Sequence, residues 1–150
     1  MNPTTGGIAD IAHAIQLALA PVFLLTGIAG TLNVMTNRLA RIIDRGRFFE
    51  EKWGQLDMAV RAASHEELVN LDRRRHFASL AINATTLSAL LVCMVVATLF
   101  AEVLLTLPLT WLAGVFFLGS TLALVFGLTA FLREVHLAMS TVRIHAAQLD

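Results

Sequence analysis

The sequence contains one cysteine, no tyrosine, three prolines and few charged residues. The single cysteine, Cys93, cannot form an intrachain disulfide or, by itself, a thiolate metal cluster. Charged residues make up 15% and hydrophobic residues 57% of the 150 residues. In soluble domains, apolar residues typically make up about 45–50% of the sequence. The composition therefore points away from a soluble globular domain and favours an integral membrane protein.

Basic residues are missing from two long parts of the chain. No Lys or Arg precedes Arg38, and none lies between Arg75 and Arg133. Nine of the eleven fall from Arg38 to Arg75, and the other two are Arg133 and Arg143. Because Lys and Arg near short spans are retained on the cytoplasmic side, this distribution predicts how the chain is threaded. Acids nearly balance bases in the basic segment, which argues against nucleic-acid binding.

Three apolar runs are long enough to cross a bilayer: residues 11–36, 77–101 and 110–132. Each exceeds the roughly 20 residues that a helix needs to span hydrocarbon. The runs are expected to be helices, because a lone strand would leave backbone groups unpaired in lipid. We therefore predict an all-α membrane protein, with residues 1–150 forming a single integral membrane domain of three transmembrane helices.

The positions of the charges predict the orientation of these helices. Residues 37–76 and the tail 133–150 are expected in the cytoplasm, with helical extensions of the spans. The N-terminus and the loop 102–107 are expected outside. Because that loop is short, the second and third spans should form a tight antiparallel hairpin.

The cytoplasmic segment carries its own helix signals. Gly46 is expected to weaken the extension of the first helix. Ser64 with Glu67 has the pattern of a capping box that opens the next helix. An apolar stripe at helical spacing lies between them, formed by Phe49, Trp53, Leu56 and Val60. Residues 48–60 either pack in a helical bundle below the membrane or lie flat among the headgroups.

The first span has one face of small and polar residues, formed by Thr26, Gly30, Asn33, Asn37 and Arg41. Lipid does not favour such a face, so protein or water must cover it. In one interpretation it is a packing surface, since small residues let helices approach and Asn bonds across them. In the other it lines a water-filled path with Arg41 at the inner mouth. The path requires a homo-oligomer, because three helices cannot enclose a pore.

The other spans carry candidate packing residues. Asn83 and Thr86 lie on one face of the second span and are expected to fix helix pairing. The third span has Gly119, Ala123 and Gly127 at spacings of four, a pattern typical of close helix contact. No carboxylate is expected to be buried in the spans, which argues against a proton-coupled transporter.

The ends of the spans carry the expected lipid anchors. Arg73, Arg74 and Arg75 precede the second span and are predicted to contact lipid headgroups. Trp111 lies where an interfacial aromatic residue is expected. The five histidines show neither an i, i+4 pair nor Cys/His spacing, so no metal site is predicted. No catalytic motif or cofactor fingerprint is present, and an enzyme is not expected.

Two stretches of the sequence resemble a known protein family. They are LAPVFLLTGIAGTLNVMTNRLARI and the arginine run before the second span. With their surroundings, over about Ile11 to Arg143, they resemble domain-of-unknown-function family 2721, an uncharacterised group of small bacterial membrane proteins. The resemblance implies a multi-pass protein of the bacterial inner (cytoplasmic) membrane with three helices. It implies no activity and carries over no functional residue.

Two functional hypotheses follow. The first is a homo-oligomeric ion channel or permeation module lined by the first span. The alternative is a non-catalytic accessory or scaffold subunit of a larger membrane complex. Both have the lipid bilayer as a partner and neither requires a cofactor.

Overall fold

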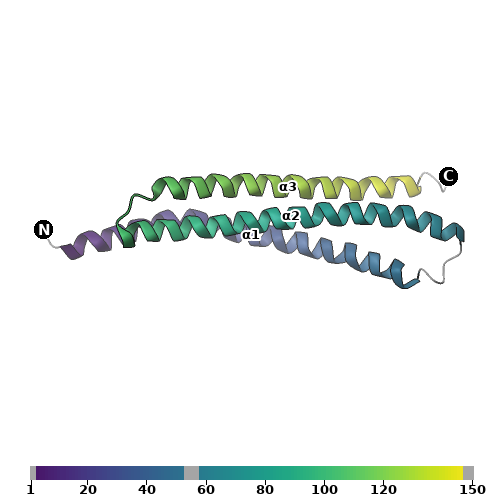
Figure 1. Ribbon diagram of the computed structural model, residues 1–150, viewed down its shortest axis with the longest axis horizontal. Coiled ribbons are helices and arrows are strands. Elements are labelled where there is room, and N and C mark those ends of the chain that lie inside the picture. The colour runs from purple at the N-terminus through teal and green to yellow at the C-terminus, as the bar shows by residue number, and fades with distance from the viewer. Residues whose placement is uncertain (1–2, 53–57, 147–150) are drawn as a thin grey trace. The chain divides into compact units, whose positions relative to one another are not determined.

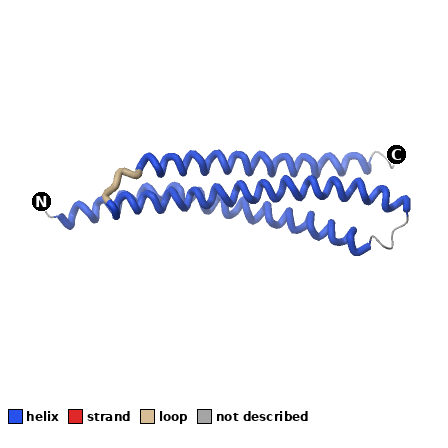
Figure 2. Tube along the Cα trace, in the orientation of Figure 1, coloured by secondary structure: helices blue, strands red, loops and turns tan. Residues whose placement is uncertain are grey.

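The computed structural model describes all residues except 1–2, 53–57 and 147–150, with side chains described for residues 10–48 and 72–138. Three long helices make up almost all of it (Figure 1). They are α1 (Pro3–Lys52), α2 (Met58–Leu105) and α3 (Thr110–Ala146). Within the described ranges there is no strand, and the connection after α2 is drawn in tan in Figure 2. The all-α prediction is confirmed.

The helices run past several predicted boundaries. Gly46 lies inside α1, and α2 already begins at Met58, so the start predicted at Ser64 and Glu67 is wrong. The predicted outer loop is also shorter, because α2 continues through Glu102 to Leu105. A glycine costs only about 1 kcal/mol in a helix interior, and adding residues to an existing helix is favourable. Local signals of this size do not end a long helix.

The amphipathic segment predicted over residues 48–60 falls partly on residues 53–57, which lie outside the described residues. Phe49 belongs to the last turns of α1, and Val60 belongs to the first turn of α2. The choice between a packed extension and a surface-bound helix therefore stays open.

The turn between α2 and α3 occupies residues 106–109. Thr106 has φ 53°, in the left-handed region, directly after the last residue of α2. The Leu109 amide donates to the Leu107 carbonyl at 2.8 Å, and the Leu112 amide donates to the Leu109 carbonyl at 2.9 Å. Ser88 of α2 then meets Ser120 of α3, so the predicted antiparallel hairpin is confirmed.

Buried positions recur every seven residues along each helix. In α1 they are Ala14, Pro21, Ile28, Met35 and Ile42. In α2 they are Ala78, Thr85 and Val92, together with Ala81, Ser88 and Val95. In α3 they are Ala113, Ser120, Gly127 and Glu134. This period of 3.5 residues is that of helices packing by knobs into holes.

The chain divides into two compact units. The first unit is Met1–Leu32 with Ala84–Val125, and the second is Asn33–Asn83 with Phe126–Asp150. Most buried side chains of the first unit are small, although Ile28 and Val92 are buried as well. The small ones include Ala14, Ala18, Ser88, Ala113 and Ser120. In the second unit Met35, Ala81 and Ala130 form a cluster against Leu80, Ile82 and Phe131, and Ile42 packs with Ala78 and Leu39.

Large apolar side chains lie on the outside instead. Phe23 is 73% exposed, Leu104 is 77% exposed and Leu118 is 62% exposed. Small residues inside and large apolar residues outside are the reverse of a water-soluble bundle and suit contact with lipid. Three helical segments are long and apolar enough to cross a membrane: Asp10–Phe48, Asp72–Leu105 and Thr110–Ala138. The prediction of three such helices is confirmed.

Candidate functional site

The least expected side chain in the structure is a buried carboxylate. Glu134 of α3 is 0% exposed and lies inside the candidate span Thr110–Ala138. Glu134 lies two residues beyond the predicted third span, which ends at Leu132, so its burial was not predicted. Glu134 occupies the position one heptad after Gly127, and both residues are buried. Helical periodicity thus places the carboxylate in the interior although it follows the exposed Arg133 directly.

Two arginines from the other helices meet this carboxylate in the second unit. Arg74 of α2 donates from a terminal guanidinium nitrogen to Glu134 Oε1 at 3.1 Å. A terminal nitrogen of Arg38, on α1, lies 3.7 Å from Glu134 Oε2. The Arg38 guanidinium also lies 5.5 Å from the centroid of the Phe131 ring, a cation–π distance. Arg38, Arg74 and Glu134 are called the ion cluster below.

Two buried polar atoms of the ion cluster have no hydrogen-bond partner. Arg74 Nε and Glu134 Oε2 are buried and make no hydrogen bond, although Oε2 has the Arg38 ion pair at 3.7 Å. The two cations exceed the single carboxylate by one positive charge. A buried charge must be paired, since an isolated one costs several kcal/mol or more. The cluster therefore ties the three helices of the second unit together at this level and fixes their rotation about their axes.

The first unit has a smaller polar contact in its interior. Ser88 Oγ donates to the Ser120 carbonyl at 2.8 Å, and Ser120 Oγ donates to the Ser88 carbonyl at 3.2 Å. Both side chains are 0% exposed. Two serines facing each other let the backbones of α2 and α3 approach closely, which is how helices pack in membranes.

The polar face of α1 is exposed along its length. Thr26, Gly30, Asn33, Asn37 and Arg41 all lie on the surface of the chain. Asn37 Nδ2 donates to Asn33 Oδ1 at 3.3 Å, so the two amides bond along the helix rather than to another helix. Thr26 Oγ1 donates to the Val22 carbonyl at 3.2 Å. The opposite side of α1 carries the buried heptad positions, so this face is not used inside the chain.

The other predicted site residues are distributed as follows. Asn83 and Thr86 are exposed, so neither belongs to the buried positions of α2. Gly119 is half-buried, and a Cβ added there would lie 3.5 Å from Leu91 Cδ1. Ala123 is half-buried and Gly127 is buried. Trp111 is 68% exposed, as an interfacial anchor requires.

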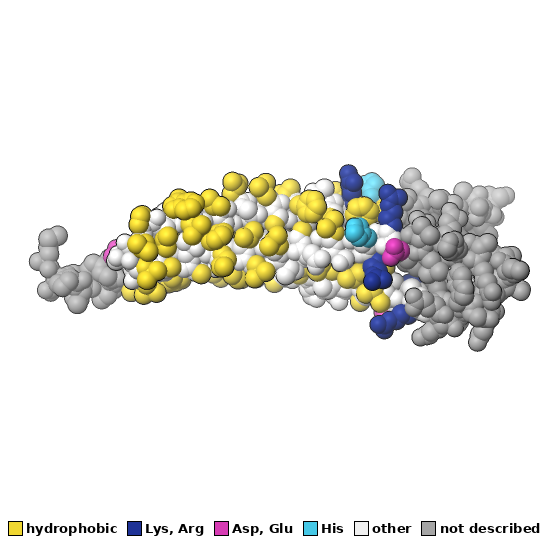
Figure 3. Space-filling model, viewed as in Figure 1, with side chains coloured by type: hydrophobic (Ala, Val, Ile, Leu, Met, Phe, Trp, Pro, Cys, Tyr) yellow, Lys and Arg dark blue, Asp and Glu magenta, His cyan; other side chains and the backbone are white. Residues whose placement is uncertain are grey.

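The three arginines before the second span point in different directions, because successive residues of a helix are about 100° apart. Arg74 points into the ion cluster, whereas Arg73 and Arg75 are exposed. Arg74 thus has a partner within the protein, and headgroup contact for the run stays a prediction. On the face shown in Figure 3, the basic and histidine side chains gather in one band.

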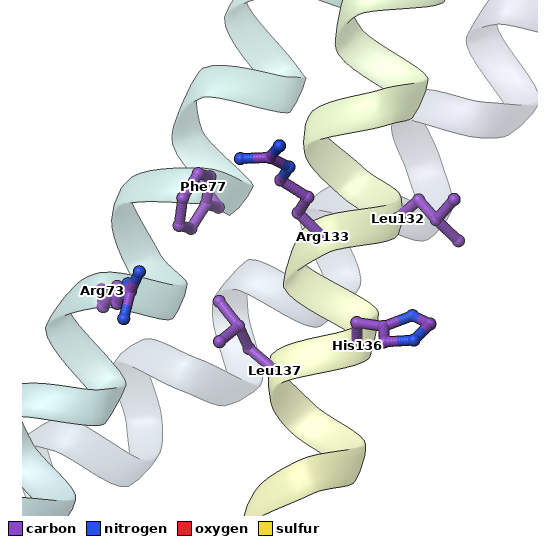
Figure 4. A pocket seen from close by; sticks show the side chains of 6 residues that line it. All are labelled: Arg73, Phe77, Leu132, Arg133, His136 and Leu137. Atoms are coloured by element: carbon purple, nitrogen blue, oxygen red, sulfur yellow. The ribbon is translucent and has the colours of Figure 1, made fainter.

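Two pockets border these elements. In the second unit a pocket of about 360 Å³ is lined by Arg73, Phe77, Leu132, Arg133, His136 and Leu137 (Figure 4). In the first unit a pocket of about 560 Å³ is lined in part by Asp10, His13, Glu102 and Thr110. Thr110 Oγ1 donates to Glu102 Oε1 at 2.7 Å. Among the described residues no group of three or more His, Cys, Asp or Glu side chains could hold a metal ion.

Sequence reasoning missed Glu134 and its contacts with Arg38 and Arg74. The predicted third span ends at Leu132, and this boundary places Glu134 in the tail. A signal was nevertheless present, because Ala113, Ser120 and Gly127 are small residues at spacings of seven and Glu134 is next in that series. Its arginine partners could not be found this way, since pairing between helices leaves no spacing in the sequence.

Three apolar helices, a small-residue interior and a surface of large apolar side chains define a multi-pass helical membrane protein. The family model described as "Protein of unknown function (DUF2721)" matches residues 18–144. The chain belongs to this family, and the resemblance drawn from its sequence is confirmed. No curated protein and no solved structure matches the chain.

Proposed function

We propose that the protein is a homo-oligomeric permeation module in which the polar face of α1 lines a path across the membrane. The observation that carries the proposal is the exposure of Asn33, Asn37 and Arg41 on α1, away from its buried positions. In a single chain in lipid, the Asn33 amide would face hydrocarbon, and the Asn37 amide would lie at the edge of the apolar run. Burying an amide without a hydrogen bond costs about 2–7 kcal/mol, and the Asn33–Asn37 bond satisfies only part of the pair.

If several copies of the chain surrounded a common axis, the amides would avoid this free-energy cost. The amides of Asn33 and Asn37 would then face water, and Thr26 and Gly30 continue the face along the helix toward its N-terminus. Arg41 would form a ring of positive charge at one mouth of the path. Rings of arginine favour anions, so a small anion such as chloride is the class of solute that we propose.

We place the protein in the bacterial inner membrane with its N-terminus outside and its C-terminus in the cytoplasm. The support is the distribution of Lys and Arg, which are absent before Arg38 and between Arg75 and Arg133. A reporter that works only in the cytoplasm should be active when fused after residue 150 and inactive when fused before residue 1. The reverse result would overturn the orientation.

Cross-linking between copies tests the assembly. Cys93 is the single cysteine, so Cys93→Ser gives a background without thiols. In that background Asn37→Cys should form a disulfide-linked dimer in native membranes. Thr36→Cys is the matched control, because Thr36 is also exposed but points about 100° away from Asn37 around the helix. Equal cross-linking at both positions would contradict an interface centred on the polar face.

Flux measurements test the activity. Liposomes holding the wild-type oligomer should release chloride, and Asn33→Leu should abolish release by closing the path with an apolar side chain. Thr36→Leu is the control and should keep wild-type flux, because Thr36 points about 100° away from Asn37 around the helix. A confirmed homo-oligomer without flux would overturn the channel. Capture of a different polypeptide at Asn37 would favour the accessory or scaffold subunit instead.

A further inference from the structure

The pocket beside α2 and α3 in the second unit combines cationic and apolar side chains. Arg73 comes from α2, and Arg133 and His136 come from α3. Phe77, Leu132 and Leu137 supply the apolar lining. Figure 4 shows the Arg133 side chain pointing from α3 toward Phe77, and Leu137 also pointing toward α2. Leu132 and His136 point away from α2, on the other side of α3 in this view.

The two arginines of this pocket differ from those of the ion cluster. Arg38 and Arg74 share the buried carboxylate of Glu134. Among the residues whose side chains are described, neither Arg73 nor Arg133 has an ion-pair partner, and both are exposed. The pocket therefore offers two guanidinium groups to an external anion. Guanidinium is well suited to phosphate, because its donors match two phosphate oxygens at once.

The pocket also lies at the level where a phospholipid changes from polar to apolar. Arg73 lies four residues before the apolar run that begins at Phe77, and Arg133 directly follows the apolar run that ends at Leu132. Leu132, next to Arg133, is 61% exposed. A lipid phosphate bound by the arginines would leave its acyl chains beside Leu132 and Phe77. A free phosphate would use the cations only.

We propose that this pocket binds an anionic phospholipid, with Arg73 and Arg133 on the phosphate and Phe77, Leu132 and Leu137 against the start of an acyl chain. Basic pockets between transmembrane helices bind lipid headgroups of this kind. The site is separate from the polar face of α1, so it stands whether or not the protein conducts ions.

Lipid titration of the purified full chain in detergent, followed by native mass spectrometry, tests the proposal. Phosphatidylglycerol should bind more tightly than phosphatidylcholine with the same acyl chains. Each basic residue near a membrane surface contributes about a factor of five in affinity. Arg73→Gln and Arg133→Gln should therefore each weaken phosphatidylglycerol binding about fivefold, and the double variant roughly 25-fold.

Arg75→Gln is the matched control. Arg75 belongs to the same arginine run and is exposed, but it does not line the pocket. It should keep wild-type affinity for phosphatidylglycerol. A loss equal to that of Arg73→Gln would show a general effect of surface charge and would overturn the site. A double variant that keeps the full preference for phosphatidylglycerol would overturn it as well.

A further pair of measurements separates lipid from free phosphate. Leu132→Ala removes apolar lining without changing a charge, and it should weaken phosphatidylglycerol binding. Inorganic phosphate at the same concentration as the lipid should not displace phosphatidylglycerol from the wild type. Full displacement by inorganic phosphate, with no effect of Leu132→Ala, would assign the pocket to a soluble anion and overturn the lipid proposal.

Discussion

The Arg74 guanidinium donates a hydrogen bond of 3.1 Å to the Glu134 carboxylate, joining α2 to α3 at a point where the carboxylate is 0% exposed. The Arg74 side chain is itself only 23% exposed. Water therefore screens the pair weakly, and each charge depends on the other for compensation. The second unit is expected to be most sensitive to substitution at these two positions.

Glu134→Ala should be strongly destabilising. Removing one partner of a buried ion pair leaves the other charge without compensation and costs about 3–5 kcal/mol. The Arg38 contribution is smaller, because its side chain is 35% exposed and its nitrogen is 3.7 Å away. The measurement is the free energy of unfolding in mixed micelles with increasing denaturing detergent, followed by circular dichroism.

Glu102→Ala is the matched control for that substitution. Glu102 is also a carboxylate that accepts a hydrogen bond, from Thr110 at 2.7 Å, but this contact is exposed. Its removal should cost about 1 kcal/mol or less. Equal losses for the two variants would show that burial of Glu134 does not decide its contribution.

Replacing both charges should restore much of the lost stability. Exchanging a buried ion pair for apolar residues of similar volume is often neutral or stabilising. Arg74→Met combined with Glu134→Met should therefore unfold at a higher detergent fraction than either single variant. The Arg38 guanidinium, on a side chain that is 35% exposed, can move toward water once the carboxylate is gone. A double variant with additive losses would argue against the ion pair as the reason for the single effects.

The sequence predicted the elements of the fold well, because hydropathy and length determine which segments can cross a membrane. The three apolar runs all fall inside helices, and the short loop before Thr110 indicated the hairpin. Boundaries were predicted less well. Gly46 and Ser64 are local signals, and helix propagation through their neighbours outweighed them.

The interior was harder to predict, because in lipid it is not marked by hydrophobicity. Ala81, Ser88 and Ser120 are buried, whereas Phe23 and Leu118 face outward. The informative pattern was the size of residues at spacings of seven, which also leads to Glu134. Exposure of the polar face of α1 was predicted only as one of two alternatives, since a helix face alone does not say what covers it.

The serine contact of the first unit allows size and hydrogen bonding to be separated. Ser120→Ala removes one hydroxyl, and a hydrogen bond between membrane helices contributes only about 0.6 kcal/mol on average. Ser120→Leu must place a large side chain where Ser120 is 0% exposed, and overpacking costs about 1–3 kcal/mol. Unfolding in mixed micelles should show a small loss for alanine and a larger one for leucine. A larger loss for alanine would mean that the hydroxyls, rather than close approach, hold the hairpin.

The turn at Thr106 offers a stabilising substitution. Thr106 has φ 53° directly after α2 ends, a conformation that disfavours a side chain branched at Cβ. The left-handed region costs an ordinary residue roughly 1–2 kcal/mol, and glycine avoids this cost. Thr106→Gly loses the hydroxyl contact with the Leu105 carbonyl, but it should still raise the free energy of unfolding by about 1 kcal/mol. Leu105→Gly serves as the control and should lower it, because Leu105 still belongs to the helix. If Thr106→Gly also lowers stability, the turn does not adopt this backbone conformation in the membrane.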